Sequence, residues 1–455
     1  MTAIADPSRL RPPGPSPWTA PVLLGRMARN RLDVMRAVAA RHGDAVRLPL
    51  GPKTLWFFNH PDHAKHVLAE NPSNYHKGIG LVHARRTLGD GLLTSEGALW
   101  TKQRKVIQPV FQARRIARQA DAVAEESVRM AARLQRAVGA GPVDIRHEMT
   151  ELTLGVLGRT LLDADLGEFG GIGAAFEAVQ DQAIFEMMSL GAVPPWVPLP
   201  RQRRFRRARA ELQEIVDRLV AHRRAQPGGI AGRDDVVSRL IESTSRETDP
   251  RVARQRMRDE LVTLLLAGHE TTASTLTWTF YLLDRHHEVW ERMHAEAVEV
   301  LGDRNPVYED LHRLRYTAMV VDEVMRLYPP VWLLPRIAQG EDVVGGWHVP
   351  AGADVVLCPY TLHRHPEFWP DPDRFDPDRF DPDRRTDRPR YAYIPFGAGP
   401  RFCVGNNLGL MEAVFVLACV TRQLRLSLQP GYQVVPEPML TLRVRGGLPM
   451  HVHEA

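Results

Sequence analysis

The stretch FGAGPRFCVG, residues 396–405, places Cys403 in a loop with three glycines, a proline and an arginine. The chain has only two other cysteines, Cys358 and Cys419, and both lie in apolar runs typical of buried positions. A cysteine that only packs in a core needs no glycine-rich loop, so this loop indicates a thiol that holds a ligand. Three cysteines cannot all pair, which argues against a disulfide framework and favours a reducing, cytoplasmic setting.

A second candidate site is AGHETT, residues 267–272, in the middle of a long helical pattern. The pattern starts at Asp249-Pro250, a capping residue followed by proline, and continues to about Arg285. Glycine and adjacent threonines are poor helix formers, so some function must offset their cost. We expect Gly268 to clear space for a flat ligand, and we expect the Thr271 hydroxyl to bond to a carbonyl one turn earlier.

The sequence patterns around these two sites predict a fold that is mainly α with small peripheral β-sheets. Helical periodicity dominates from about residue 60 to 330, and a further helix follows the cysteine loop over roughly 406–424. Strand-like runs are short: a hairpin near the N-terminus, a set over 331–360 and a piece at the C-terminus. The repeat DPDRFDPDRFDPDR has too many prolines for a helix or strand, so we expect an ordered meander with Phe375 and Phe380 packed inward.

Composition limits the class of protein. No linker divides the 455 residues, so we expect a single domain over 1–455, with 1–40 partly an irregular lead. The net charge of +5 is mild, and nucleic-acid binding would need a concentrated basic stripe. The strongest basic run, residues 201–213, is interpreted as a solvated helix face, with membrane contact or an acidic partner as alternatives. No segment approaches the roughly 20 apolar residues of a membrane span, so no membrane anchor is expected.

The motifs together resemble those of the cytochrome P450 family. FGAGPRFCVG is similar to that family's haem-ligand loop, and AGHETT resembles its oxygen-activating helix motif. Glu323 and Arg326 match its Glu-x-x-Arg helix, and Arg379 matches the arginine that completes that ion-pair set. Trp100 and Arg104, in WTKQR, match a weaker motif. All five motifs occur in the family's order over most of the chain, which makes the resemblance specific.

The resemblance implies a haem b cofactor, buried between the long central helix and the helix that follows Cys403. Cys403 would ligate the iron as a thiolate, because the N-terminal end of a helix favours an anion. Gly399 and Gly405 would fold the backbone around the sulfur, while Gly409 departs from the alanine usual in the family and would loosen the packing under the haem. The other residues expected at the haem are Phe396, Gly397, Gly405, Ala267 and Gly268, with Arg401, Trp100, Arg104 and Arg336 as propionate partners.

The implied activity is that of a haem-thiolate monooxygenase, which inserts one oxygen atom from O2 into a lipophilic small molecule. Thr271 and Glu270 would relay protons, because a hydroxyl beside a carboxylate suits proton delivery through water. Glu323, Arg326 and Arg379 would form a structural network that holds the meander. Epoxidation, desaturation or ring formation on the same fold is an alternative. A non-catalytic haem sensor is a further alternative, disfavoured because a sensor needs no proton delivery.

The resemblance also implies where substrate and electrons would bind. The expected pocket walls are apolar, which favours a terpenoid, fatty acid or polyketide, although any single member could equally be core. No room remains for a flavin or iron–sulfur domain, so electrons would come from a separate ferredoxin and ferredoxin reductase, docked on the basic segment 100–118 of a monomer. The expected pocket residues are Ile79, Leu81, Val82, Phe185, Met188, Leu264, Val331, Trp332, Leu333 and Met439.

Overall fold

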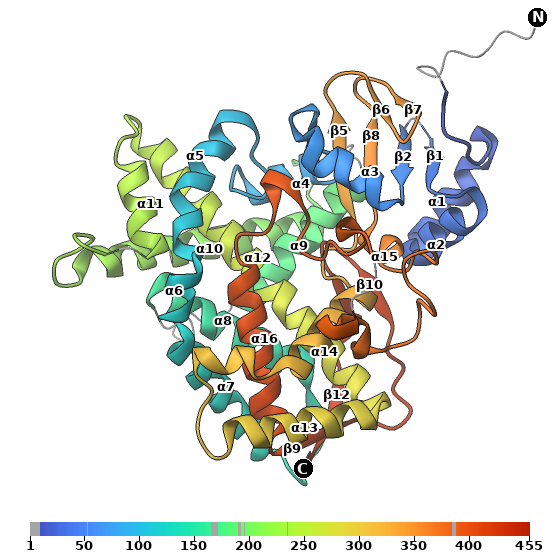
Figure 1. Cartoon of the computed structure of the whole chain (residues 1–455). Coiled ribbons are helices and arrows are strands. Elements are labelled where there is room, and N and C mark those ends of the chain that lie inside the picture. Colours follow the sequence, from blue (N-terminus) through green and yellow to red (C-terminus); the bar gives the residue numbers. More distant parts are fainter. Residues whose placement is uncertain are drawn as a thin grey trace, which may run out of the picture. The chain divides into compact units, whose positions relative to one another are not determined.

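The computed structural model describes residues 10–51, 53–164, 172–189, 193–194, 196–233, 235–384 and 388–455. The chain forms two compact units. Figure 1 labels their helices and strands. Unit 1 comprises Met1–Val82 and Met325–Cys403, and unit 2 comprises His83–Val324 and Val404–Ala455. Helices predominate in the described part and the sheets are small, which confirms the predicted fold class. The single domain expected over the whole chain stays a prediction.

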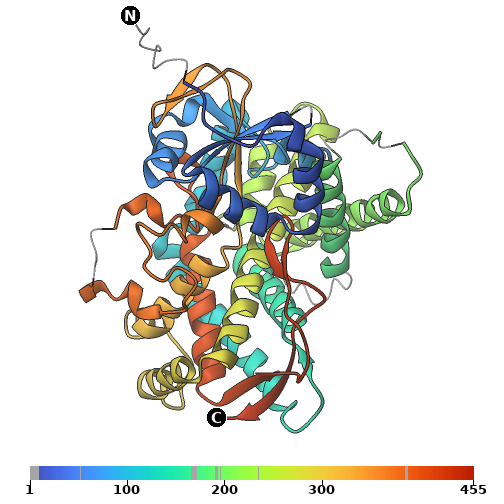
Figure 2. The same ribbon diagram turned by 90° about the vertical axis from the view of Figure 1, so that its right-hand side faces the viewer.

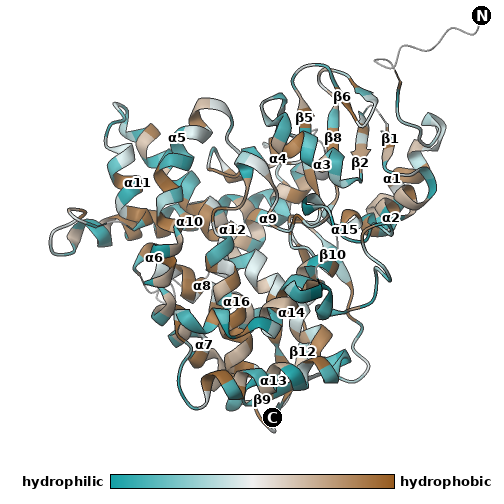
Figure 3. Cartoon of the chain, in the orientation of Figure 1, coloured by the Kyte–Doolittle hydropathy of each residue, from teal (hydrophilic) through white to brown (hydrophobic). Residues whose placement is uncertain are grey.

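Unit 1 is built around a five-stranded sheet in the order β1-β2-β8-β5-β3. Strands β1 and β2 form the predicted antiparallel hairpin, β8 runs parallel to β2, and β5 pairs antiparallel with both β8 and β3. Strands β2 and β8 are mostly apolar (Figure 3), and all four residues of β8 are buried. The bounds are β1 (Ala45–Leu50), β2 (Lys53–Phe58), β3 (Tyr75–Lys77), β5 (Leu334–Ala338) and β8 (Asp354–Leu357), with a separate hairpin of β6 (Asp342–Val344) and β7 (Trp347–Val349).

Short helices and the meander complete unit 1. As predicted, Phe375 is buried, and the Phe380 ring lies 5.8 Å from the ring of Trp369 and 4.9 Å from that of Tyr393, centroid to centroid. In the described residues of the meander and the cysteine loop, the helical elements are all 3-10 turns, because proline and glycine interrupt longer helical hydrogen-bond ladders. The elements are η2 (Pro17–Thr19), α1 (Ala20–Arg29), α2 (Arg31–His42), α3 (Pro61–Lys65), η3 (His66–Glu70), η4 (Pro72–Asn74), α15 (Pro359–Leu362), η9 (Pro377–Phe380), η10 (Pro382–Arg384), η11 (Arg390–Ala392) and η12 (Gly399–Arg401).

Unit 2 is a helical assembly around two largely buried helices, α12 and α16. Helices α4 (Leu81–Leu88) and α14 (Arg315–Leu327) each cross a boundary between the units. The other helices are α5 (Gly97–Ile107), η5 (Gln108–Phe111), α6 (Ala113–Ala117), α7 (Ala120–Gln135), α8 (Ile145–Leu157), η6 (Gly158–Leu162), α9 (Ile172–Met188), α10 (Pro200–Ala225), α11 (Val236–Thr244), α12 (Pro250–Arg285), α13 (His287–Leu301), η8 (Tyr308–His312) and α16 (Asn406–Thr421).

Helix α12 begins and ends where the sequence predicts. The side chain of Asp249 caps it by accepting from the N–H of Arg251 at 2.8 Å, and Pro250 occupies the first turn. Its 36 residues span about 54 Å at 1.5 Å per residue. The predicted apolar stripe, which includes Leu261 and Leu265, is buried. Helix α16 is buried from Met411 onward, so a hydrophobic helix follows the cysteine loop as expected.

The strands that the structure describes in unit 2 lie in two small sheets, which contain the predicted C-terminal strands. Figure 2 shows the sheet β4-β12-β9 near the C-terminus and the β10–β11 hairpin extending from it. None of the helices in the described ranges combines the length and apolarity that a membrane span requires. The bounds are β4 (Val143–Asp144), β9 (Leu424–Leu428), β10 (Pro436–Pro438), β11 (Leu442–Val444) and β12 (Pro449–Glu454).

Candidate active site

The cysteine loop closes on itself within unit 1. The N–H of Cys403 donates to the carbonyl of Phe396 at 3.0 Å, so the loop turns back on its own start. Gly397 and Gly399 have φ angles of 71° and 66°, a region that residues with a Cβ rarely adopt. A Cβ on Gly399 would also overlap the carbonyl oxygen of Leu68. Two of the three loop glycines are therefore required by the backbone.

Gly405 is different, and the expectation that it folds the loop by its flexibility is wrong. Its φ of −91° is open to any residue. A Cβ built on it would meet only the ring of Phe111, at 3.7 Å, which is ordinary contact. Gly405 instead occupies the N-cap position of α16, where glycine is common.

Among the three cysteines, Cys403 alone has an exposed side chain. Burial raises the pKa of Cys358 to about 11 and that of Cys419 to about 12, so neither thiol suits a thiolate role near neutral pH. Helix α16 begins at Asn406, three residues after Cys403, and the N-terminal end of a helix favours negative charge. The donor set therefore fits a thiolate ligand of haem at Cys403.

Within unit 2, Gly268 serves the packing of α12 against α8. A Cβ built on Gly268 would lie 2.7 Å from Cδ2 and 2.9 Å from Cδ1 of Leu157, which is buried on α8. The missing side chain therefore makes room for Leu157. The sequence did not predict this packing role, and the expectation that Gly268 clears space for a flat ligand stays a prediction. The neighbouring Ala267 is exposed, so the open face of the helix begins there.

The hydroxyl of Thr271 bonds as predicted. Its Oγ1 donates to the carbonyl of Ala267, one turn earlier, at 2.8 Å. Thr271 is half-buried, whereas the next residue, Thr272, is buried. A Cβ on Gly409 of α16 would lie 3.4 Å from Thr272 Oγ1, so the alanine usual in the family would just fit and its absence changes the packing little.

Glu270 is held by the β10–β11 hairpin. Thr441 Oγ1 donates to Glu270 Oε1 at 2.8 Å, and Arg443 on β11 pairs with Glu437 at 2.9 Å. Burial raises the pKa of Glu270 to about 7, and the bond from Thr441 and the charge of Arg443 keep it from rising further. Its Oε2 has no hydrogen-bond partner among the described residues. A carboxyl with a pKa near 7 both gives and takes protons at neutral pH.

The sequence reasoning missed Thr441 and Arg443, because 171 positions separate Thr441 from Glu270. It also missed a pair of acids that anchor the segment 89–95 to α12. Asp259 Oδ2 accepts from the N–H of Asp90 at 2.9 Å, and Glu260 Oε2 accepts from the N–H of Leu92 at 3.1 Å. Burial raises the pKa of Glu260 to about 8, against the lowering effect of the Leu92 bond. Two adjacent acidic residues in a helical pattern do not indicate that their side chains bind the backbone of a distant segment.

The expected propionate partners divide between the units. Trp100 and Arg104 lie four residues apart on α5 of unit 2, and Arg104 Nε donates to Gln108 at 3.0 Å. Arg401 ends η12 in unit 1, and Arg336 is a buried residue of β5. Their roles at a haem stay predictions.

The arginines expected in the structural network hold the meander through backbone carbonyls. Arg326 on α14 is fully buried and donates to three carbonyl oxygens, those of His363, Pro372 and Arg374, at 2.7–3.0 Å. Arg379 donates to the carbonyl of a meander residue at 2.9 Å. Glu323, also fully buried, precedes Arg326 by three positions on α14. Arg326 and Arg379, which both lie in unit 1, thus hold the meander as predicted.

The expected substrate-pocket residues lie in both units, and their common pocket stays a prediction. In unit 1, Trp332 is buried, Val82 is exposed, and Ile79, Leu81, Val331 and Leu333 are partly buried. In unit 2, Leu264 is buried, Met439 is partly buried, and Phe185 is partly buried under the Arg201 guanidinium at 5.0 Å. The side chain of Met188 lies outside the described part.

Comparisons with known proteins agree with this arrangement. The family model described as "Cytochrome P450" matches residues 11–449. Two proteins of Streptomyces melanosporofaciens, "Cyclooctatin synthase" and "Cyclooctat-9-en-7-ol 5-monooxygenase", are each 37% identical to this chain over 94% of its length and 92% of theirs. "Pentalenene oxygenase" of Streptomyces avermitilis is 31% identical over 94% of both chains.

Proposed function

The chain belongs to the cytochrome P450 family and is a haem-dependent monooxygenase, and from that premise we propose that it oxidises a lipophilic terpenoid. The observation that carries this proposal is the near full-length similarity to relatives named for cyclooctat-9-en-7-ol and pentalenene. Both names describe unsaturated compounds with few or no polar groups. They favour the terpenoid among the three substrate types that the sequence suggests, over a fatty acid or a polyketide.

We propose that the cofactor is haem b and that Cys403 ligates its iron. When bound, a haem with a thiolate ligand supplies the activation of O2 and the insertion of one oxygen atom into the substrate. The exposed thiol, the closed loop and the helix that follows support Cys403 in this role. Arg401, Trp100, Arg104 and Arg336 are the proposed partners of the haem carboxylates.

We propose that Thr271 and Glu270 supply protons during the reaction. Thr271 is the accessible hydroxyl of the α12 motif, and Glu270 is the adjacent carboxyl whose pKa of about 7 suits proton exchange. Glu270 Oε1 is engaged by Thr441, which leaves Oε2 as the atom to exchange a proton with water or with Thr271.

We propose that electrons come from a separate ferredoxin and its reductase, and that the enzyme works as a cytoplasmic, single-domain monomer. The proposed dock is the basic segment 100–118. Lys102 is the weaker part of it, because it already donates to Glu247 at 3.2 Å. Lys105, Arg114 and Arg118 are exposed and are the stronger candidates for an acidic partner.

Two measurements test the proposed function. The first replaces each cysteine in turn: Cys403→Ser should abolish the red-shifted Soret band of the reduced carbon monoxide complex, whereas Cys358→Ala and Cys419→Ala should keep it. A band that survives in Cys403→Ser would remove Cys403 as the ligand.

The second measurement is a spectral titration of the ferric holoenzyme with matched sets of terpenoids, fatty acids and polyketides. Cyclic terpene alkenes and their mono-alcohols should shift the Soret band at the lowest concentrations. A response confined to fatty acids or polyketides would refute the terpenoid assignment and leave the monooxygenase assignment intact.

A further inference from the structure

The N-terminal half of α10 is strongly basic. Six arginines lie between residues 196 and 210, and no acidic residue occurs in that stretch. Positions 203, 206 and 207 follow the i, i+3, i+4 spacing that places side chains on one face of a helix. All three are exposed, whereas the opposite face buries Ala208, Leu212 and other apolar residues. We call Arg203, Arg206 and Arg207 the outer arginine face.

The outer arginine face differs from its neighbours in having no partner. Arg204 pairs with Asp181 at 3.4 Å on α9, and Arg201 lies over the ring of Phe185. The side chains of the outer arginine face make no hydrogen bond or ion pair with any residue that the structure describes. Three unpaired like charges within two helical turns repel one another, so fold stability does not explain them.

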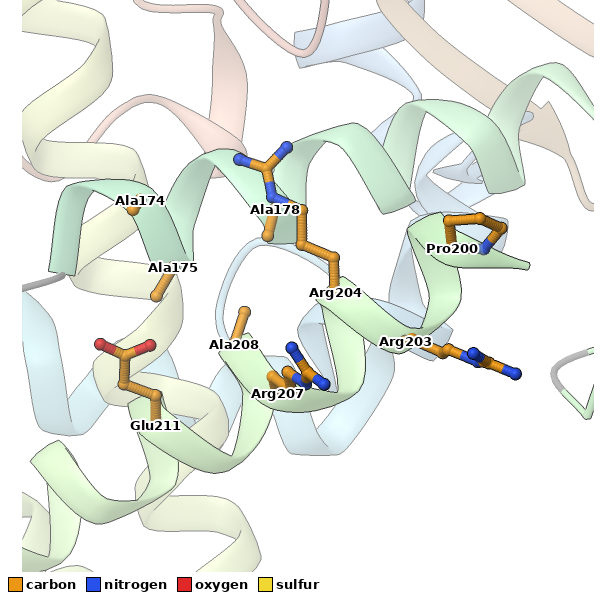
Figure 4. A pocket seen from close by; sticks show the side chains of 9 residues that line it. All are labelled: Ala174, Ala175, Ala178, Pro200, Arg203, Arg204, Arg207, Ala208 and Glu211. Carbon is orange, nitrogen blue, oxygen red and sulfur yellow. The ribbon is translucent and has the colours of Figure 1, made fainter. Parts of the chain in front are cut away.

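A shallow groove of about 410 Å³ runs beside this face, between α9 and α10 (Figure 4). Alanines from both helices form its floor, while arginines and Glu211 form its rim. The groove therefore offers apolar walls beneath a positively charged edge. Its lining residues are Ala174, Ala175, Ala178, Pro200, Arg203, Arg204, Arg207, Ala208 and Glu211.

A highly exposed tryptophan, Trp196, lies just before α10. The side chain of Trp196 is 76% exposed. Its turn is tied to the start of α10, because the buried Gln202 donates to the carbonyl of Pro194 at 3.2 Å. The turn is therefore held beside the first turns of the basic helix. Tryptophan is enriched at the interface of membranes with water, where its ring lies at the level of the head groups.

We propose that the outer arginine face and Trp196 bind the surface of an anionic phospholipid membrane. The arginines offer positive charge to anionic head groups, and the tryptophan offers an aromatic ring at the level where those head groups lie. Phosphate groups would pair with the arginines, and the alanine-floored groove accepts apolar atoms beside them. This contact brings α9 and α10 to a surface in which a lipophilic compound dissolves. The inference depends on charge and exposure, so it stands whatever the substrate is.

The strength of this contact follows from the charges. Each arginine close to an anionic leaflet strengthens binding by about fivefold, so the three together contribute about a hundredfold. Because exposed charges are screened over about 8 Å at physiological salt, binding should weaken steeply as salt is added.

The test measures sedimentation of the holoenzyme with vesicles of phosphatidylcholine alone or with 30 mol% phosphatidylglycerol, a composition on the order of anionic leaflets. The wild type should bind the anionic vesicles only. The triple variant R203Q/R206Q/R207Q should bind them about a hundredfold more weakly, and W196A should weaken binding without changing its salt dependence. The matched control R224Q/R246Q/R251Q removes the same charge from exposed positions elsewhere in unit 2 and should bind like the wild type.

Three results would overturn the proposal. The first is a wild type that does not sediment with anionic vesicles. The second is an equal loss in the control triple, which would assign the effect to net charge. The third is a triple variant that keeps vesicle binding but loses binding to an acidic ferredoxin, which would make this face a protein dock. Retention of the Soret spectrum by every variant excludes unfolding as the cause.

Discussion

The packing of Gly268 against Leu157 predicts that the effect of Gly268→Ala on stability depends on Leu157. The substitution should destabilise the protein when Leu157 is present and stabilise it when Leu157 is replaced by alanine. In Gly268→Ala, the new Cβ would lie 2.7 and 2.9 Å from the two Leu157 methyl carbons, whereas carbon atoms rest at about 3.5–4.0 Å. The overlap is about 1 Å, and overpacking of this kind costs about 1–3 kcal/mol. Alanine in a helix interior returns about 1 kcal/mol relative to glycine. We expect the single variant to be less stable by about 1 kcal/mol.

The second variant removes the obstacle. Leu157→Ala deletes both methyl carbons and should cost about 2–5 kcal/mol by leaving a cavity. On that background, Gly268→Ala no longer overlaps anything and partly fills the space. It should then stabilise by about 1 kcal/mol, which is its helix-propensity gain. The two substitutions should therefore couple by about 2 kcal/mol, within the range measured for residues in contact.

The assay is the thermal midpoint of four holoproteins: the wild type, both single variants and the double variant. Gly268→Ala should lower the midpoint in the wild-type background and raise it in the Leu157→Ala background, by about 2 °C each. A rise in both backgrounds would refute the packing argument. If that rise came with loss of haem or slower O2 consumption, the glycine would instead serve the ligand side of α12.

Three further predictions concern charge. Glu260 holds its proton in the folded protein up to a pKa of about 8, so its contribution to stability is lost as pH rises from about 4.5 to 8, at most about 5 kcal/mol. Glu260→Gln cannot ionise, so its thermal midpoint should fall less between pH 5.5 and pH 9 than that of the wild type; equal falls would contradict the assignment. Arg443→Gln removes a charge that lowers the pKa of Glu270, so the alkaline limb of product formed per NADPH should move to higher pH, and an unmoved limb would remove Glu270 from proton supply. Reversing Lys105 and Arg118 to glutamate should slow reduction by ferredoxin and flatten its salt dependence, with substrate titration unchanged as the control; a normal salt slope would place the dock elsewhere.

Local signals in the sequence predicted the elements well. Asp249 capped α12 where expected, because capping depends on neighbouring residues only. Phe375 and Phe380 packed inward because the proline-rich repeat leaves them as the apolar members of the meander. Contacts between distant segments escaped prediction. The bond from Thr441 to Glu270 depends on where the β10–β11 hairpin lies along α12, and no periodicity encodes that.

The glycines show most clearly what cannot be predicted from the sequence, because glycine can be required for different physical reasons at different positions. Gly399 is required since a Cβ would overlap the Leu68 carbonyl and since its φ is 66°. Gly268 is helical and is needed for the side chain of Leu157. Gly405 has an ordinary φ and open surroundings. The motif match attributed the same role, folding the loop around the sulfur, to Gly399 and Gly405, and the structure separates these two glycines.

Accessibility, rather than hydrogen bonding, distinguishes the threonine of the α12 motif. Thr271 donates to the carbonyl four residues earlier, and so do Thr275, Thr277 and Thr279 further along the same helix. The shared bond therefore reflects a common way to satisfy a hydroxyl inside a helix. The later three are at most 5% exposed, whereas Thr271 is half-buried beside the exposed Ala267. Of these four hydroxyls, that of Thr271 alone belongs to a residue that is not buried, which supports its proposed role in proton supply.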